Sequence, residues 1–122
     1  MIGIDKIDLQ KTFVLDWYST DSDFVISVDA CLLQSHPLYS LPLNGEIGPY
    51  RKVKFIFVGI VTISGLLEKS EVSFSLDPDG TKDYGEIETF AVNTCGEIGI
   101  CGEFGDVVIS CKEFNIEYEP SE

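Results

Sequence analysis

The chain has 122 residues, 44% of them hydrophobic and 24% charged, which is ordinary globular composition. This length fits one domain spanning residues 1–122 and leaves little room for a second core. The 21 acidic and eight basic residues give a net charge of −13, a sign that repels nucleic-acid phosphates and anionic lipid headgroups. We therefore expect binding neither to nucleic acid nor to a membrane surface.

The negative charge is concentrated toward the C-terminal side of the sequence. Residues 83–122 contain ten acidic residues, and Lys112 is their only lysine or arginine. Such a surface attracts cationic partners and speeds their encounter, although solubility alone explains it equally well.

The sequence also bears on the compartment. Its longest apolar run, residues 55–61, is far shorter than the roughly 20 residues of a spanning helix, and the N-terminal residues do not resemble a secretory signal. We expect a cytoplasmic protein in which Cys31, Cys95, Cys101 and Cys111 are free thiols.

Period-two alternation of apolar residues predicts strands in the first half of the chain. Residues 7–18 form the first, with an interruption at Lys11 that indicates a bulge or an edge. Residues 24–32 alternate cleanly and form a hairpin with the first strand, while the proline- and glycine-rich residues 34–50 form a long loop. Residues 51–63 are apolar on both faces, which is typical of a central, covered strand. In the first strand, five residues share one parity and should face the core together: Ile7, Leu9, Phe13, Leu15 and Trp17.

The second half continues the pattern. A short helical turn around residues 66–70 precedes a strand at 72–76, and the sequence Asp77-Pro78-Asp79-Gly80 then forms a turn. Further strands follow, at residues 87–92, 98–101 and 106–114, the last extended by Ile116 and Tyr118. We predict an all-β fold of about seven strands, either an antiparallel sandwich or a strongly curved sheet, with at most one short helical turn.

Histidine-, serine- and phosphate-loop-based catalytic motifs are absent from the sequence, and its 21 acidic residues make any particular carboxylate pair uninformative. His36 is the only histidine and is followed by Pro37 in the predicted loop, so a histidine-dependent general base has one possible position and no local partner. The chain has neither a Gly-x-Ser-x-Gly elbow nor a glycine-rich phosphate loop before a helix. We expect a non-enzymatic protein without cofactors.

Metal sites are not predicted either. The cysteine spacings do not match structural zinc sites, and in the acidic segment 77–86 Gly80 comes too early for an EF-hand calcium loop. An aspartate-rich turn explains that segment without a ligand. If residues 102–105 form a hairpin loop, the register brings Cys95 and Cys111 close, with their side chains on the same or on opposite faces.

One block resembles a known class of proteins. Asp77-Pro78-Asp79-Gly80, Asp83-Tyr84-Gly85-x-Ile87 and Gly102-x-Phe104-Gly105-x-Val107-x-Ile109 look like a segment of small, acidic, β-rich bacterial proteins of immunity type. The resemblance is strongest over residues 75–110. Such proteins are encoded beside polymorphic toxins, including those of contact-dependent growth inhibition, so the resemblance implies an inhibitor of a cognate toxin.

Charge leads independently to a compatible function. Nuclease toxins have basic active-site clefts, and a strongly acidic domain complements them. We expect an immunity protein that neutralises a basic toxin by blocking its active site or substrate path, and the sequence leaves its oligomeric state open. The alternative is a small-ligand or carbohydrate-binding β-domain that stacks its ligand on Trp17, Tyr18, Tyr39 and Tyr50. The predicted toxin contacts are carboxylates and two turn aromatics: Asp77, Asp79, Asp83, Tyr84, Glu86, Glu97, Glu103 and Phe104.

Overall fold

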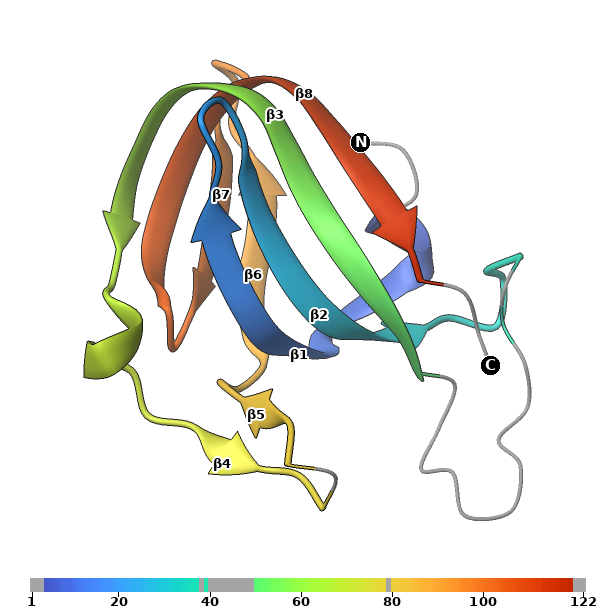
Figure 1. Cartoon of the computed structure of the whole chain (residues 1–122). Coiled ribbons are helices and arrows are strands. Elements are labelled where there is room, and N and C mark those ends of the chain that lie inside the picture. The colour runs from blue at the N-terminus through green and yellow to red at the C-terminus, as the bar shows by residue number, and fades with distance from the viewer. Residues whose placement is uncertain (1–3, 38, 40–49, 79, 120–122) are drawn as a thin grey trace.

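A computed structural model describes residues 4–37, 39, 50–78 and 80–119, so most of the expected loop at 34–50 lies outside the described residues. In the described part of the chain, a six-stranded antiparallel sheet is accompanied by a two-stranded one (Figure 1). The elements are η1 (Ile4–Lys6), β1 (Ile7–Ser19), β2 (Phe24–Leu32), β3 (Tyr50–Leu66), η2 (Lys69–Glu71), β4 (Ser75–Leu76), β5 (Lys82–Asp83), β6 (Ile87–Val92), β7 (Ile98–Gly102) and β8 (Gly105–Tyr118).

The large sheet curls into a half-barrel. Its strand order is β1-β2-β3-β8-β7-β6, and an isolated antiparallel bridge joins Phe13 of β1 to Glu86, the residue before β6. Beside this bridge, Val14 N–H donates to the Gly85 carbonyl and Tyr84 N–H donates to the Val14 carbonyl, each at 2.8 Å. The predicted all-β fold is thus confirmed in its strongly curved form. The described residues contain two 3₁₀ turns, η1 and η2, where at most one short helical turn was expected.

The long strands β3 and β8 bend with the sheet (Figure 1). Gly59 in β3 has a φ of 68°, which a glycine adopts at little cost. Its N–H donates to Asp23 Oδ1 at 3.0 Å, and the next N–H, that of Ile60, donates to the Ser22 carbonyl at 2.7 Å. The turn between β1 and β2 is therefore hydrogen-bonded to the bend of β3.

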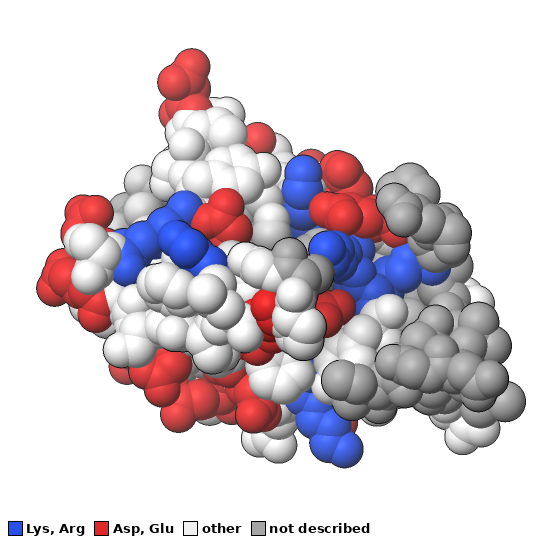
Figure 2. All heavy atoms as spheres, turned by 60° about the horizontal axis from the view of Figure 1, so that its bottom comes forward, with Lys and Arg blue, Asp and Glu red and all other residues white. Residues whose placement is uncertain are grey.

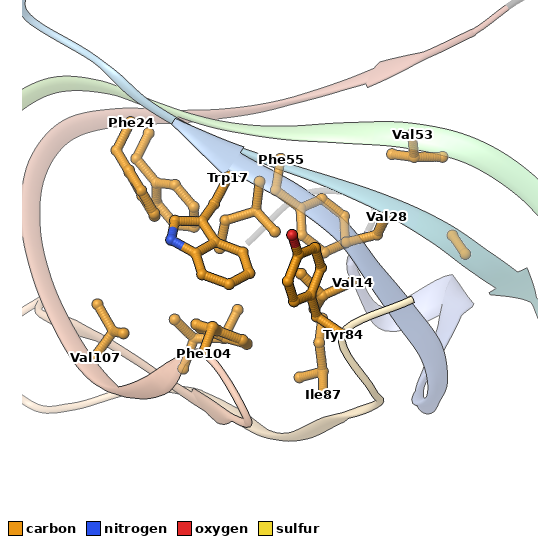
Figure 3. Packing of buried hydrophobic residues seen from close by; sticks show 14 of the residues in the cluster. Val14, Trp17, Phe24, Val28, Val53, Phe55, Tyr84, Ile87, Phe104 and Val107 are labelled. Atoms are coloured by element: carbon orange, nitrogen blue, oxygen red, sulfur yellow. The ribbon is translucent and has the colours of Figure 1, made fainter. Parts of the chain in front are cut away.

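The concave side of the sheet holds the hydrophobic core. Aromatic rings of three segments meet there: the Trp17 ring lies 4.8 Å from Tyr84 and 5.8 Å from Phe104, measured between centroids (Figure 3). The predicted alternation of β2 is confirmed, because its inward residues are all buried: Phe24, Ile26, Val28, Ala30 and Leu32.

The predicted facing of β1 is confirmed at Ile7 and Trp17, which are buried, but is wrong in the middle of the strand. Register shifts between Asp8 and Phe13, and again between Val14 and Asp16, change which side chains point inward. Thr12 and Val14 are buried, whereas Phe13 and Leu15 are half-buried. The shift begins beside Lys11, where the sequence indicated a bulge.

Two other strands differ from their predicted extent. The central strand runs from Tyr50 to Leu66, and its second face is half-buried at Ile56 and Val58. The strand expected at 72–76 shrinks to Ser75–Leu76, because it pairs only with the equally short β5 and leaves Leu76 exposed. The hairpin of β7 and β8 has the predicted register, with Cys101 opposite Asp106.

Two glycines allow β3 to approach the β7–β8 turn closely. Gly65 has a φ of 87°, and a Cβ at this position would lie 1.9 Å from the Asp106 carbonyl oxygen. Gly105 faces it, and a Cβ there would lie 2.2 Å from the Gly65 carbonyl oxygen. Next to this contact, Leu67 N–H donates to the Phe104 carbonyl at 2.9 Å.

We predict that Gly65→Ala destabilises the protein far more than Gly80→Ala. Gly80 is a matched control, because its φ is 88° and nothing lies within 4 Å of a Cβ placed there. Gly80→Ala should lower the free energy of unfolding by about 1–2 kcal/mol, the cost of the left-handed backbone alone. Gly65→Ala adds a backbone clash and should cost about 3 kcal/mol or more. Denaturant unfolding measures both values, and equal losses would contradict the close approach.

Candidate functional site

An open groove follows the line where β1 and β6 meet. One part, of about 360 Å³, is lined by Phe13, Phe74, Tyr84 and neighbouring residues. The other part, of about 610 Å³, is lined by Gln10, Ile87 and Glu88, and both parts share Gly85, Glu86 and Glu103. We call this depression the seam groove.

The charged side chains that line the seam groove are all acidic. Its carboxylates come from Asp83, Glu86, Glu88 and Glu103, and none of the described residues that line it is a lysine or an arginine. On the face that Figure 2 brings forward, the lower side of Figure 1, basic side chains are interspersed with acidic ones. The groove is therefore a local concentration of negative charge beside exposed aromatic surface.

The backbone around Gly85 holds these carboxylates together. Gly85 has a φ of 98°, and its N–H donates to Asp83 Oδ1 at 2.8 Å. A Cβ on Gly85 would lie 3.1 Å from Cγ of Glu103, so the absence of a side chain lets the β7–β8 turn approach. Immediately after this turn, Glu86 and Glu88 stand on either side of the buried Ile87.

Of the predicted contact residues, the structure brings Asp83, Glu86 and Glu103 into one groove. Glu97 does not join them, because it lies in the turn between β6 and β7 and accepts a hydrogen bond from Asn93 Nδ2 at 3.0 Å. Asp77 closes the β4–β5 turn through its carbonyl, which accepts from Gly80 N–H at 2.8 Å. Asp79 lies outside the described residues.

Tyr84 and Phe104, the two aromatic residues predicted as contacts, are not exposed in the structure. Tyr84 is 5% exposed and Phe104 is fully buried, because the curl of the sheet folds both turns inward onto Trp17. Adjacent glycines indicated a turn correctly, but a turn at the mouth of a half-barrel can point into the core. Phe74, at 47% exposed, is the aromatic side chain that the groove presents to solvent.

Sequence reasoning missed Glu88. A signal was available, since Glu86 and Glu88 flank Ile87 in a predicted strand and residues two apart share a face. Glu88 also contacts β7, where Cys101 Sγ lies 3.7 Å from its Oε2.

The single histidine is part of the packed structure. His36 is 7% exposed, and its Nε2 lies 2.7 Å from the Tyr118 hydroxyl. Burial lowers the pKa of His36, and the positive charges of Lys6 and Arg51 lower it further.

The cysteines do not form disulfides in the structure. Cys95 is exposed in the β6–β7 turn, whereas Cys111 lies in β8 opposite Ile60. The β7–β8 ladder ends at the pair of Ile98 and Ile109, so the register that would bring the two thiols together does not continue to them. Burial raises the pKa of Cys31, Cys101 and Cys111, which disfavours their thiolate forms.

The described ranges contain neither a metal-site candidate nor a candidate membrane-spanning helix. No group of three or more histidine, cysteine, aspartate or glutamate residues there is arranged to hold a metal ion. None of the described helices is long and apolar enough to span a membrane. Comparison with protein-family models, curated proteins and solved structures finds no match to this chain.

We predict that Phe104→Ala lowers the free energy of unfolding by about 3–5 kcal/mol, the usual cost of removing a buried aromatic ring. Phe74→Ala is the matched control and should cost less than about 1 kcal/mol, because Phe74 is 47% exposed. Chemical denaturation distinguishes the two. Similar small losses for both variants would place Phe104 at the surface.

We predict that His36 makes stability fall as the pH is lowered. A His36 pKa that is lower in the folded state than in the unfolded state means that the unfolded chain binds the proton more readily. This contribution is complete above the unfolded pKa of about 6.5 and is lost as the pH falls through the folded pKa. Unfolding midpoints of the wild type and of His36→Gln between neutral and mildly acidic pH test this. The variant should show the smaller decrease, and parallel curves would contradict the role of His36.

Proposed function

We propose that this protein is an immunity-type inhibitor that binds a cognate basic toxin, with nuclease toxins as the class that its charge fits best. The observation that carries the proposal is the seam groove, where carboxylates of Asp83, Glu86, Glu88 and Glu103 gather without a basic lining residue. The net charge of −13 adds a long-range attraction for a basic partner.

The proposed inhibition is occlusion. A nuclease cleft must attract phosphates, so its basic residues are complementary to a fixed group of carboxylates. The carboxylates steer the encounter, and the exposed ring of Phe74 supplies apolar contact beside them. Lys82 Nζ already lies 4.8 Å from the centroid of the Phe74 ring, so that ring takes part in a cation–π contact within the chain itself.

The proposed action is binding rather than catalysis. His36, the only histidine, is buried against Tyr118 away from the residues that line the groove. Inhibition by binding needs only a complementary surface, which the groove offers.

The alternative, a domain that binds a small ligand on aromatic surfaces, is less well supported. It requires accessible aromatic faces, and Trp17, the largest of the four proposed rings, is 3% exposed. Because Trp17 packs against Tyr84 and Phe104, a ligand could stack on it only if the core opened.

We predict that reversing the groove charges slows binding to the toxin encoded by the neighbouring gene. The triple variant Glu86→Lys, Glu88→Lys, Glu103→Lys should reduce the association rate at low salt by about tenfold or more, because steering charges act mainly on that rate. Stopped-flow or surface-based kinetics at several salt concentrations measure the effect, which should shrink as salt rises.

The matched control is Glu68→Lys, Glu71→Lys, Glu113→Lys. These glutamates are exposed and lie outside the residues that line the groove, and their reversal changes the net charge by the same amount. The control should lose clearly less in association rate. Equal losses would assign the effect to net charge and reject the groove as the contact site, and failure of the wild type to bind the neighbouring toxin would reject the proposed function.

A further inference from the structure

The outer edge of β6 is open beside the seam groove. β6 is the last strand of the six-stranded sheet and pairs only with β7, apart from the single bridge at Glu86 that precedes it. β1 also lies near β6 across the seam groove, but among the described residues no strand other than β7 forms a ladder with β6 from Glu88 to Val92.

The register shows which backbone groups face this opening. Asn93 N–H donates to the Glu97 carbonyl across the β6–β7 turn, and Ala91 lies opposite Gly99 two residues further along the pair. Hydrogen-bonding groups alternate in direction along a strand, so those of Ala91 point toward β7 while those of Phe90 and Val92 point away from it. Phe90 and Val92 thus offer unpaired N–H and C=O groups to an added strand.

The opposite edge of the sheet is less suited to pairing. β1 carries two register shifts, which disrupt a regular row of donors and acceptors. β6 keeps an unbroken register from Thr89 to Val92 and lacks the lysine or proline that commonly protects an edge strand. Val92 is 50% exposed, so apolar surface accompanies the free backbone groups.

The charge around this edge defines its partner. Glu86, Glu88 and Glu103 line the part of the groove that lies between β6 and Gln10 of β1, and no basic residue belongs to that lining. A second copy of this chain would bring another charge of −13 to the same place. An extended segment with lysine or arginine at alternate positions satisfies the backbone groups and the carboxylates together.

We propose that the partner contributes such a segment as an added strand on β6, extending the sheet at the open side of the half-barrel. This inference rests on the proposed function, because the partner is taken to be a basic protein. It specifies that this protein binds by strand addition. Main-chain hydrogen bonds to Phe90 and Val92 supply affinity, while cationic side chains beside Glu86 and Glu88 supply selectivity.

The first test uses the full chain and a short synthetic peptide of alternating lysine and valine as the probe. Binding is measured by calorimetry, and amide hydrogen exchange of the protein is followed by NMR. Without peptide, the amides of Phe90 and Val92 should exchange much faster than those of Thr89 and Ala91, and saturating peptide should protect them. A peptide methylated at alternate backbone nitrogens should bind about tenfold more weakly or worse, because it cannot form the ladder.

A protein variant supplies the reciprocal test. Val92→Pro removes the outward N–H without removing a bond to β7, whereas the matched control Val92→Ala keeps that N–H. Val92→Pro should weaken peptide binding about tenfold and Val92→Ala much less. Should the proline variant fail to fold, the methylated peptide and the exchange measurement decide the question.

Several outcomes would overturn strand addition. These are the absence of peptide binding, equal binding of the methylated peptide, or unprotected Phe90 and Val92 amides in the complex. Protection that depends on protein concentration without peptide would assign the edge to a second copy of the chain. A toxin that binds Val92→Pro as well as it binds the wild type would reject strand addition and leave the proposed function intact. Peptide binding without any toxin binding would support strand addition and reject the proposed function.

Discussion

The hydrogen bonds between Val14 and the segment Tyr84-Gly85 join the two ends of the sheet. Every other ladder of the large sheet connects neighbouring strands, whereas this contact holds β1 near β6 and so turns a curved sheet into a half-barrel. The Trp17 ring reinforces it from inside by packing on Tyr84. The seam groove depends on the same contact, because Gln10 and Phe13 line it from one end of the sheet and Glu86 and Glu88 from the other. The packing of Trp17 on Tyr84 and the seam groove therefore both depend on this one contact.

Much of the fold could be predicted from local patterns in the sequence. Residues 24–32 alternate regularly, and the structure places strands there and at the predicted residues 87–92. The inward residues in the middle of β1 could not be predicted, because register shifts beyond Asp8 transfer burial from Phe13 to Val14. A bulge depends on how a strand pairs with its neighbour, and a single strand's sequence shows it only as an interruption such as the one at Lys11.

The candidate site was less predictable than the fold. The acidic segment identified Asp83 and Glu86 because they are close in sequence, and the β7–β8 turn added Glu103. Whether Glu97 joins them depends on the length of β6 and β7, and whether Phe104 faces solvent depends on the curl of the sheet. Both are long-range properties that composition and turn motifs do not contain. Phe74 was assigned to a strand, and its exposure follows from how short that strand is.

The pairing of β3 with β8 also constrains the order in which the chain can fold. β3 joins β2 on one side and β8 on the other, and β8 begins at Gly105, well after β3 ends at Leu66. During synthesis, β1, β2 and β3 can pair early. The edge of β3 that pairs with β8 stays unpaired until β8, the last strand, has been synthesised. Val53, Phe55 and Phe57 are buried in the folded protein. Until β8 has been synthesised, part of the structure that buries them is missing. The nascent chain is therefore most prone to aggregation between the synthesis of β3 and that of β8.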